Sequence, residues 1–64
     1  MIRVNGEPLD FVVESVEELL SRLGVETRGV AVALDGDVIR KSDWAITRIV
    51  DGSAIEIVTA VAGG

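Results

Sequence analysis

The end of the chain holds the residues whose types and spacing suggest chemistry most directly. Three small apolar residues at positions 60–62 are followed by Gly63 and Gly64, with which the chain finishes. Glycine has no Cβ atom, so a Gly-Gly end can thread a narrow channel and adopt almost any φ. An enzyme that reacts with a terminal carboxylate needs such a slender substrate. These residues therefore predict that Gly64 is the reactive position and Gly63 its slender neighbour.

A carboxylate is a poor electrophile, so a partner would first have to activate the end of the chain. Reaction with ATP would give an acyl-adenylate, and a sulfur nucleophile could then displace AMP to leave a thiocarboxylate. The stretch Ala60, Val61 and Ala62 could lie extended along a groove or sheet edge of the partner, with backbone hydrogen bonds supplying affinity. The competing interpretation is an inert end, because chain termini are commonly disordered.

The composition argues that the chain is not itself an enzyme. It has 64 residues, which is enough for one domain with one core. It contains no Cys and no His, which excludes thiol nucleophiles, His general bases and the usual zinc and haem ligands. We therefore expect no catalytic residue, no metal site and no bound cofactor. ATP would be used by the partner.

Charge and hydropathy exclude two further classes of function. The formal net charge of −5 would repel a polyanion, and Phe11 and Trp44 are too few aromatics for a base-stacking platform. We predict no nucleic-acid partner. No apolar run approaches the ~20 residues that span a bilayer, and the first residues are too quickly polar for a signal peptide. We expect a cytoplasmic protein with no membrane contact.

The elements that must carry this tail are predicted by turn signals and periodicity. The dipeptides Asn5-Gly6, Asp35-Gly36 and Asp51-Gly52 accept positive φ between strands. Alternation predicts strands over residues 2–5, 9–13, 29–34, 38–39 and 54–58. Residues 41–45 are expected to form an irregular segment with a turn capped by Ser42.

A helix is predicted after the second strand. Ser15 is a natural N-cap, and Glu18 three residues later completes a capping box. Gly24 is placed to end the helix in the left-handed region. The helical spacing forms one apolar stripe of Val16, Leu19, Leu20 and Leu23.

The order strand, strand, helix, strand, strand, irregular segment, strand is that of an α+β domain with a β-grasp layout. One helix with one apolar stripe can cover one face of a mixed sheet. We predict a β-grasp domain over residues 1–58 and an extended tail over residues 59–64. Alternation leaves Ala31, Ala33 and Val58 on the uncovered face, where they could form a docking surface. Small residues on an outer face are also common without any function.

Three further features have competing interpretations. Asp35-Gly36-Asp37 resembles part of a calcium loop, but Arg40 and Ile46 stand where that loop needs Gly and Glu, so a hairpin turn is predicted. Trp44 is interpreted as a plug of the core or sheet edge, with a partner hot spot as the competing role. The basic residues of the irregular segment could meet an acidic partner or simply be solvated: Arg40, Lys41 and Arg48.

Ordered sequence blocks along the whole chain carry a family resemblance. They are Val4–Glu7, Ser15–Leu20, Gly29–Ile39, Asp43–Ala45, Asp51–Ser53 and Ile57–Gly64. Together they resemble the ThiS family, the sulfur carriers of thiazole formation in thiamine biosynthesis, which have the β-grasp, ubiquitin-like fold.

The resemblance implies a reaction cycle with three partners. A ThiF-like adenylating enzyme would adenylate Gly64, a cysteine desulfurase system would supply persulfide sulfur, and the thiocarboxylate would donate sulfur to a ThiG-like thiazole synthase. Sibling carriers for molybdopterin or cysteine synthesis share the fold and the Gly-Gly end. Two further hypotheses are a ubiquitin-like modifier, joined through Gly64 to a lysine, and a plain interaction domain with an inert tail.

Overall fold

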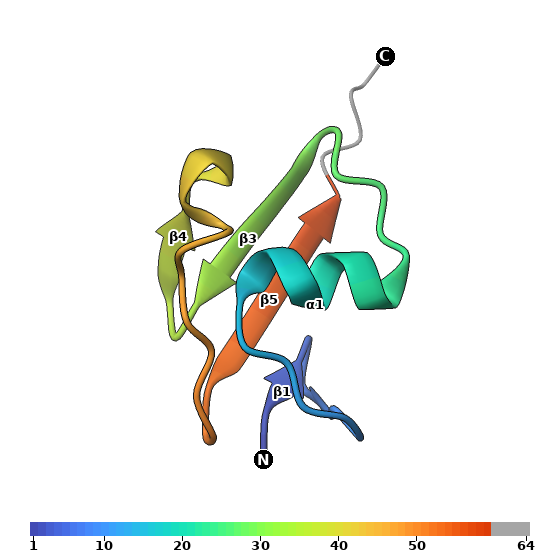
Figure 1. Cartoon of the computed structure of the whole chain (residues 1–64), viewed down its shortest axis with the longest axis vertical. Coiled ribbons are helices and arrows are strands. Elements are labelled where there is room, and N and C mark those ends of the chain that lie inside the picture. The colour runs from blue at the N-terminus through green and yellow to red at the C-terminus, as the bar shows by residue number, and fades with distance from the viewer. Residues whose placement is uncertain (60–64) are drawn as a thin grey trace.

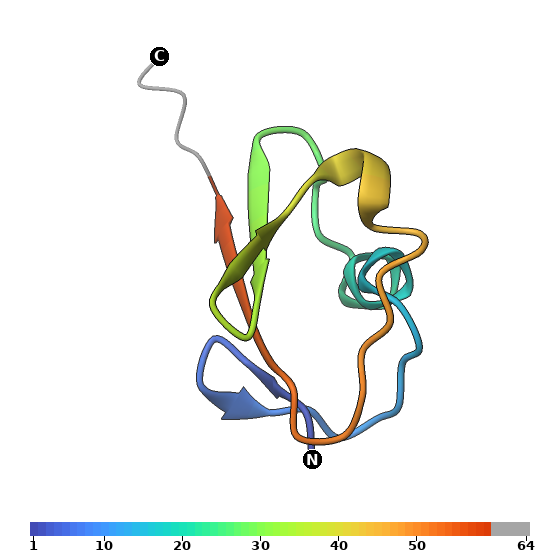
Figure 2. The same cartoon turned by 90° about the vertical axis from the view of Figure 1, so that its left-hand side faces the viewer.

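In the computed structural model, residues 1–59 are described, and within them five strands form a single mixed sheet. The spatial order is β2 (Glu7–Pro8), β1 (Arg3–Val4), β5 (Ala54–Thr59), β3 (Val30–Leu34) and β4 (Asp37–Ile39). β1 and β5 run parallel, and the other neighbours are antiparallel. The helix α1 (Val16–Leu23) lies across one face (Figures 1 and 2). The predicted two-layer α+β arrangement is confirmed.

The helix begins and ends where its capping residues predict. Ser15 Oγ accepts a hydrogen bond from the Glu18 N–H at 3.1 Å, and Gly24 adopts φ 70° after the last turn. The Glu18 carboxylate accepts from the N–H of Glu14 at 2.7 Å, one residue before the N–H that a capping box uses. Thr47 and Trp44 carbonyls accept the first two helical N–H groups, so the irregular segment also anchors the helix.

The core lies between this helix and the inner face of the sheet. Val16, Leu19 and Leu20 are buried from the helix, and Val32 and Ile55 from the central strands, as the alternation predicts. Leu23 belongs to the predicted stripe, but its side chain is 40% exposed. It lies in the last turn of an eight-residue helix, beyond the buried cluster.

The second predicted strand, over residues 9–13, is wrong. β2 comprises only Glu7 and Pro8, and the bond from the Leu9 N–H to the Ile2 carbonyl is followed by irregular backbone. The chain must leave the sheet edge here to reach the helix at Ser15. Alternation persists without a strand, since Val13 is buried while Val12 is 80% exposed. The pattern therefore predicts burial correctly and strand pairing incorrectly.

The other strands match their predicted ranges within one residue at each end. Both hairpin turns are confirmed, because Asn5-Gly6 and Asp35-Gly36 each have two consecutive positive φ angles. Gly52 also has positive φ, at 91°, but its turn joins the irregular segment to β5 and does not connect two named strands.

The irregular segment contains a short 3₁₀ helix, η1 (Lys41–Asp43). The predicted Ser42 cap is wrong: η1 begins after Arg40 and has no side-chain cap bond. Trp44, directly after η1, is only 4% exposed, and its Nε1 donates to the Ile39 carbonyl at 3.2 Å. The core-plug interpretation of Trp44 is therefore confirmed, with its one polar atom paired.

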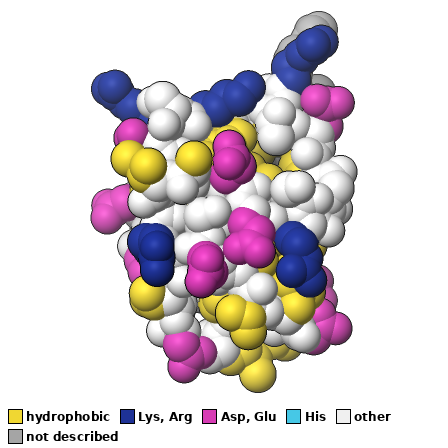
Figure 3. All heavy atoms as spheres, viewed as in Figure 1, with side chains coloured by type: hydrophobic (Ala, Val, Ile, Leu, Met, Phe, Trp, Pro, Cys, Tyr) yellow, Lys and Arg dark blue, Asp and Glu magenta, His cyan; other side chains and the backbone are white. Residues whose placement is uncertain are grey.

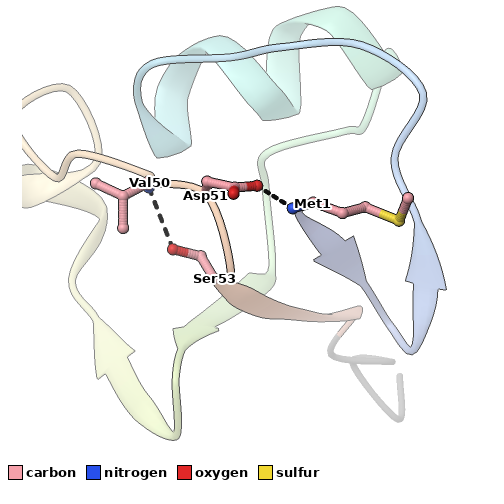
Figure 4. Close-up of polar contacts among 4 residues, drawn as sticks. All are labelled: Met1, Val50, Asp51 and Ser53. Carbon is pink, nitrogen blue, oxygen red and sulfur yellow. Dashed lines mark hydrogen bonds and ion pairs between the residues drawn. The ribbon is translucent and has the colours of Figure 1, made fainter.

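Polar contacts connect the first residue of the chain to the turn before β5. The Met1 α-amino group pairs with the Asp51 carboxylate, and Ser53 Oγ accepts from the Val50 N–H at 3.2 Å (Figure 4). The Gly52 N–H also donates to the Met1 carbonyl. The two contacts of Met1 hold β1 beside the start of β5, where the parallel pairs Arg3–Ala54 and Val4–Ile55 form, and the Ser53 contact closes the turn itself.

Candidate functional site

The predicted reactive and recognition residues lie outside the described residues: Gly64, Gly63, Ala62, Val61 and Ala60. The site is therefore defined by the strand that leads to them. β5 continues through Thr59, which the predicted boundary assigns to the tail. In Figure 1 the end of β5 lies at the opposite end of the molecule from Met1.

The tail follows the strand at the centre of the sheet. β3 pairs with β5 along its length, from Leu34 opposite Ile55 to Val30 opposite Thr59. β1 covers only the first part of the other edge, through Ala54 and Ile55. The final described residues of β5 are thus held by a strand on one side, while β1 has already ended on the other.

The three predicted docking residues are brought together on the sheet face away from the helix. The register places Ala31 directly opposite Val58, and Ala33 lies one alternation further along β3. Val58 is 60% exposed, Ala31 is exposed and Ala33 is half-buried. This surface begins beside the end of β5 and is continuous with the strand that leads to the tail.

Sequence reasoning missed two residues of this face. Val38 of β4 pairs with Ala33 and is 77% exposed, so it extends the apolar surface. Glu56 lies opposite Ala33 on its other side and introduces a negative charge. The register of a two-residue turn at Asp35-Gly36, which pairs residue 34 with 37 and residue 33 with 38, would have found Val38. We define the docking face as Ala31, Ala33, Val38 and Val58.

The charged side chains do not form one continuous surface. Figure 3 shows Lys and Arg side chains at the upper end of the molecule and at mid-height on both sides, with Asp and Glu side chains between them. Arg40 and Lys41 are adjacent at the start of η1, whereas Arg48 lies opposite Ser15 at the start of the helix. The three basic residues therefore come from two different places on the irregular segment.

The remaining surface features lie away from the end of β5. Asp35 has a structural role in its turn, because its Oδ1 accepts a hydrogen bond from the Ala54 N–H at 2.9 Å. A cavity of about 380 Å³ near the N-terminus is lined mainly by apolar residues, including Met1, Leu9 and Phe11. Apolar side chains are visible at this lower end in Figure 3. Residues 1–59 contain no cluster of three or more Asp and Glu side chains placed to hold a metal.

No helix in the described part of the chain has the length and apolar character needed to cross a membrane.

Comparisons with known proteins agree on one family. The model of the ThiS family matches residues 2–64. The sulfur carrier protein ThiS of Thermus thermophilus is 33% identical over 64 residues, which are 100% of both chains. A thiazole synthase of Paramagnetospirillum magneticum is 40% identical over 62 residues, which cover 95% of this chain. The chain spans only 19% of the length of that relative.

Solved structures agree with the fold. The crystal structure of the thiamine biosynthesis protein ThiS from Geobacter metallireducens has a TM-score of 0.81 and 34% identity, over 98% of this chain and 97% of that one. The solution structure of a thiamine biosynthesis protein from the same organism has a TM-score of 0.77 and 36% identity, over 98% and 86% of the two chains. The predicted β-grasp fold is confirmed, and the chain belongs to the ThiS family of sulfur carrier proteins.

Proposed function

We propose that this sulfur carrier holds its sulfur as a thiocarboxylate on Gly64 and donates it to a thiazole synthase in thiamine biosynthesis. The observation that carries the proposal is the family match, which runs through the Gly-Gly end to residue 64. The scaffold supports it, because β5, the strand that precedes the tail in the sequence, is the central strand of the sheet and carries the exposed Val58 of the docking face.

The chemistry divides between the carrier and its partners. A carboxylate oxygen of Gly64 attacks the α-phosphate of ATP in a ThiF-like adenylating enzyme, and pyrophosphate leaves. A persulfide from a cysteine desulfurase system attacks the acyl carbon, and AMP leaves. A thiol of the sulfur-transfer partner then cleaves the resulting acyl disulfide, which releases the thiocarboxylate and a disulfide. The carrier supplies the acyl group, and its partners supply ATP binding and catalysis.

The thiazole synthase relative supports the choice of acceptor. A segment similar to this whole chain lies within a polypeptide that is named for thiazole synthesis and extends far beyond the match. Joining a carrier-like segment and a thiazole synthase in one polypeptide keeps a sulfur donor close to its acceptor. The adenylating enzyme and the desulfurase system complete the proposed set of partners, and we place the cycle in the cytoplasm.

The docking face supplies the recognition surface in this proposal. Ala31 and Val58 form a cross-strand pair with small, exposed apolar side chains, and Val38 extends this surface onto β4. An apolar surface of this kind can bind a partner while the tail, with Ala60, Val61, Ala62 and Gly63, enters the partner's channel.

Intact mass spectrometry tests the function directly. The protein is incubated with a ThiF-like adenylating enzyme, ATP and a persulfide source, and is then transferred to thiazole synthase. We expect a gain equal to one oxygen-to-sulfur exchange, lost again on transfer. A ladder of conjugates to other proteins would instead indicate a modifier, and an unchanged mass with an active enzyme would refute the carrier cycle.

A further inference from the structure

The side chains of two turn residues form hydrogen bonds with the backbone of β5, one at its start and one toward its end. Asn5 and Asp35 each occupy the first position of a two-residue hairpin turn, with φ of 52° and 50°. The Asp35 carboxylate accepts from the Ala54 N–H at 2.9 Å, at the start of β5. The Asn5 carboxamide contacts Ile57, toward the end of β5. The side chain of each turn residue therefore binds the backbone of the central strand, and we call each of these contacts a clamp.

The Asn5 side chain bonds to β5 at a position where β1 has no further residue to pair with it. β1 ends at Val4 because the Asn5-Gly6 turn redirects the chain into β2, whereas β5 continues beyond Ile55. The Asn5 N–H still donates to the Ile55 carbonyl at 2.8 Å. Its Oδ1 then accepts from the Ile57 N–H at 2.8 Å, and its Nδ2 donates to the Ile57 carbonyl at 3.3 Å.

A carboxamide suits this position because it carries both a donor and an acceptor, as a peptide group does. The polar groups of β5 alternate in direction, so that Ala54 bonds toward the β3 side and Ile57 toward the β1 side. Asn5 thus extends the ladder on the β1 side by one further step toward the tail. Only residues 58 and 59 of β5 follow this step.

We propose that Asn5 is a positioning residue for the reaction at Gly64, an inference that rests on the proposed function. By holding both polar groups of Ile57, it fixes the direction in which β5 leads into the tail. The docking face binds the partner, and the clamp aligns the strand relative to that face. Alignment matters because a displacement of ~1 Å at a reacting atom can cost ~100-fold in rate.

The substitution Asn5→Gly tests the side-chain clamp separately from the turn. Gly accepts φ 52° without strain, so Asn5→Gly keeps the turn and removes both side-chain bonds. Asn5→Asp keeps the acceptor for the Ile57 N–H but loses the donor to its carbonyl. Asp35→Gly is the matched control, since it removes the equivalent clamp at the far end of β5.

The test combines amide hydrogen exchange with the kinetics of ATP–pyrophosphate exchange by the adenylating enzyme. Asn5→Gly should accelerate exchange of the Ile57 amide and lower kcat by about tenfold, with KM for the carrier unchanged because the docking face is intact. Asn5→Asp should lower kcat by less. Asp35→Gly should accelerate exchange at Ala54 and leave kcat unchanged.

The possible outcomes distinguish this inference from the function on which it rests. Wild-type kcat in a folded Asn5→Gly protein would overturn the positioning role alone. An equal loss of kcat in Asp35→Gly would also overturn it, since general loosening of β5 would then explain both variants. An inactive wild-type carrier with an active enzyme would overturn the proposed function, and the positioning role with it.

Discussion

At the scale of single residues, the proposed chemistry uses one carboxylate, that of Gly64. Asn5 and Asp35 show how turn residues can serve a second purpose, because each pairs with backbone groups of β5 while it allows the positive φ of its hairpin. The turns were predictable from their Asn-Gly and Asp-Gly dipeptides. The clamps were not, because they depend on which strand lies beside each turn.

Deleting Gly64 should abolish activation and leave the fold intact. The buried core is formed by residues between Ile2 and Ile55, so thermal unfolding should be nearly unchanged. The new terminal carboxylate would lie ~3.3–3.6 Å short of the ATP α-phosphate, which is far beyond the tolerance of a positioned reaction. Intact mass after incubation with adenylating enzyme, ATP and persulfide should show sulfur on the wild type only.

A substitution at Gly63 tests the need for a slender end. Gly63→Val should slow activation, because its β-branched side chain would crowd the partner's channel and restrict φ. Gly63→Ala, with a single added methyl group, is the control and should be less impaired. Initial rates of pyrophosphate release in the presence of the adenylating enzyme give the comparison, and equal rates for all three proteins would argue against a narrow channel.

At the scale of elements, local signals predicted the helix well and the second strand poorly. Ser15 and Gly24 bound the helix through contacts within a few residues, so its two ends could be predicted from local sequence. The Thr47 and Trp44 carbonyls that also anchor its start could not. Residues 9–13 alternate in burial because they cross the edge of the core, and this pattern looks the same as that of a half-buried strand. Pairing depends on a neighbouring strand, which alternation does not specify.

Leu20→Ala tests the helix face. Leu20 is fully buried against the core, so truncation should lower the free energy of unfolding by ~2–5 kcal/mol. Leu23→Ala is the matched control in the same helix, and because Leu23 is 40% exposed its effect should stay below about 1 kcal/mol. Urea denaturation followed by far-UV circular dichroism gives both values. Similar losses in the two variants would contradict the assigned face.

At the scale of the whole molecule, the fold separates two ends with different characters. The end of β5 lies at the end of the molecule opposite Met1 (Figure 1), and the docking face begins there with the pair of Ala31 and Val58. The N-terminal cavity is lined by Met1, Leu9 and Phe11. The sequence placed Ala31, Ala33 and Val58 on one face by alternation alone. Val38 was missed because the three residues of β4 are too few to show their own alternation, and their face follows only from the register of the Asp35-Gly36 hairpin.

This difference between the two ends predicts that a charge on the docking face weakens binding to the adenylating enzyme, while the same charge at the N-terminal end does not. Val58→Asp places a carboxylate in the apolar surface next to Ala31, where partner binding would have to desolvate it. Affinity for the adenylating enzyme should fall at least about tenfold, equivalent to ~1.4 kcal/mol. Val12→Asp is the matched control, because Val12 is 80% exposed and lies in the wall of the N-terminal cavity.

Both side chains are largely exposed, so both variants should unfold within a few degrees of the wild type. Titration calorimetry with the adenylating enzyme then isolates binding from folding. Loss of affinity in Val58→Asp alone would place the interface on the sheet face beside the end of β5. Equal loss in the two variants would mean that net charge, and not this face, controls association. Loss in Val12→Asp alone would move the interface to the N-terminal end, away from the end of β5 that precedes the proposed reactive residue.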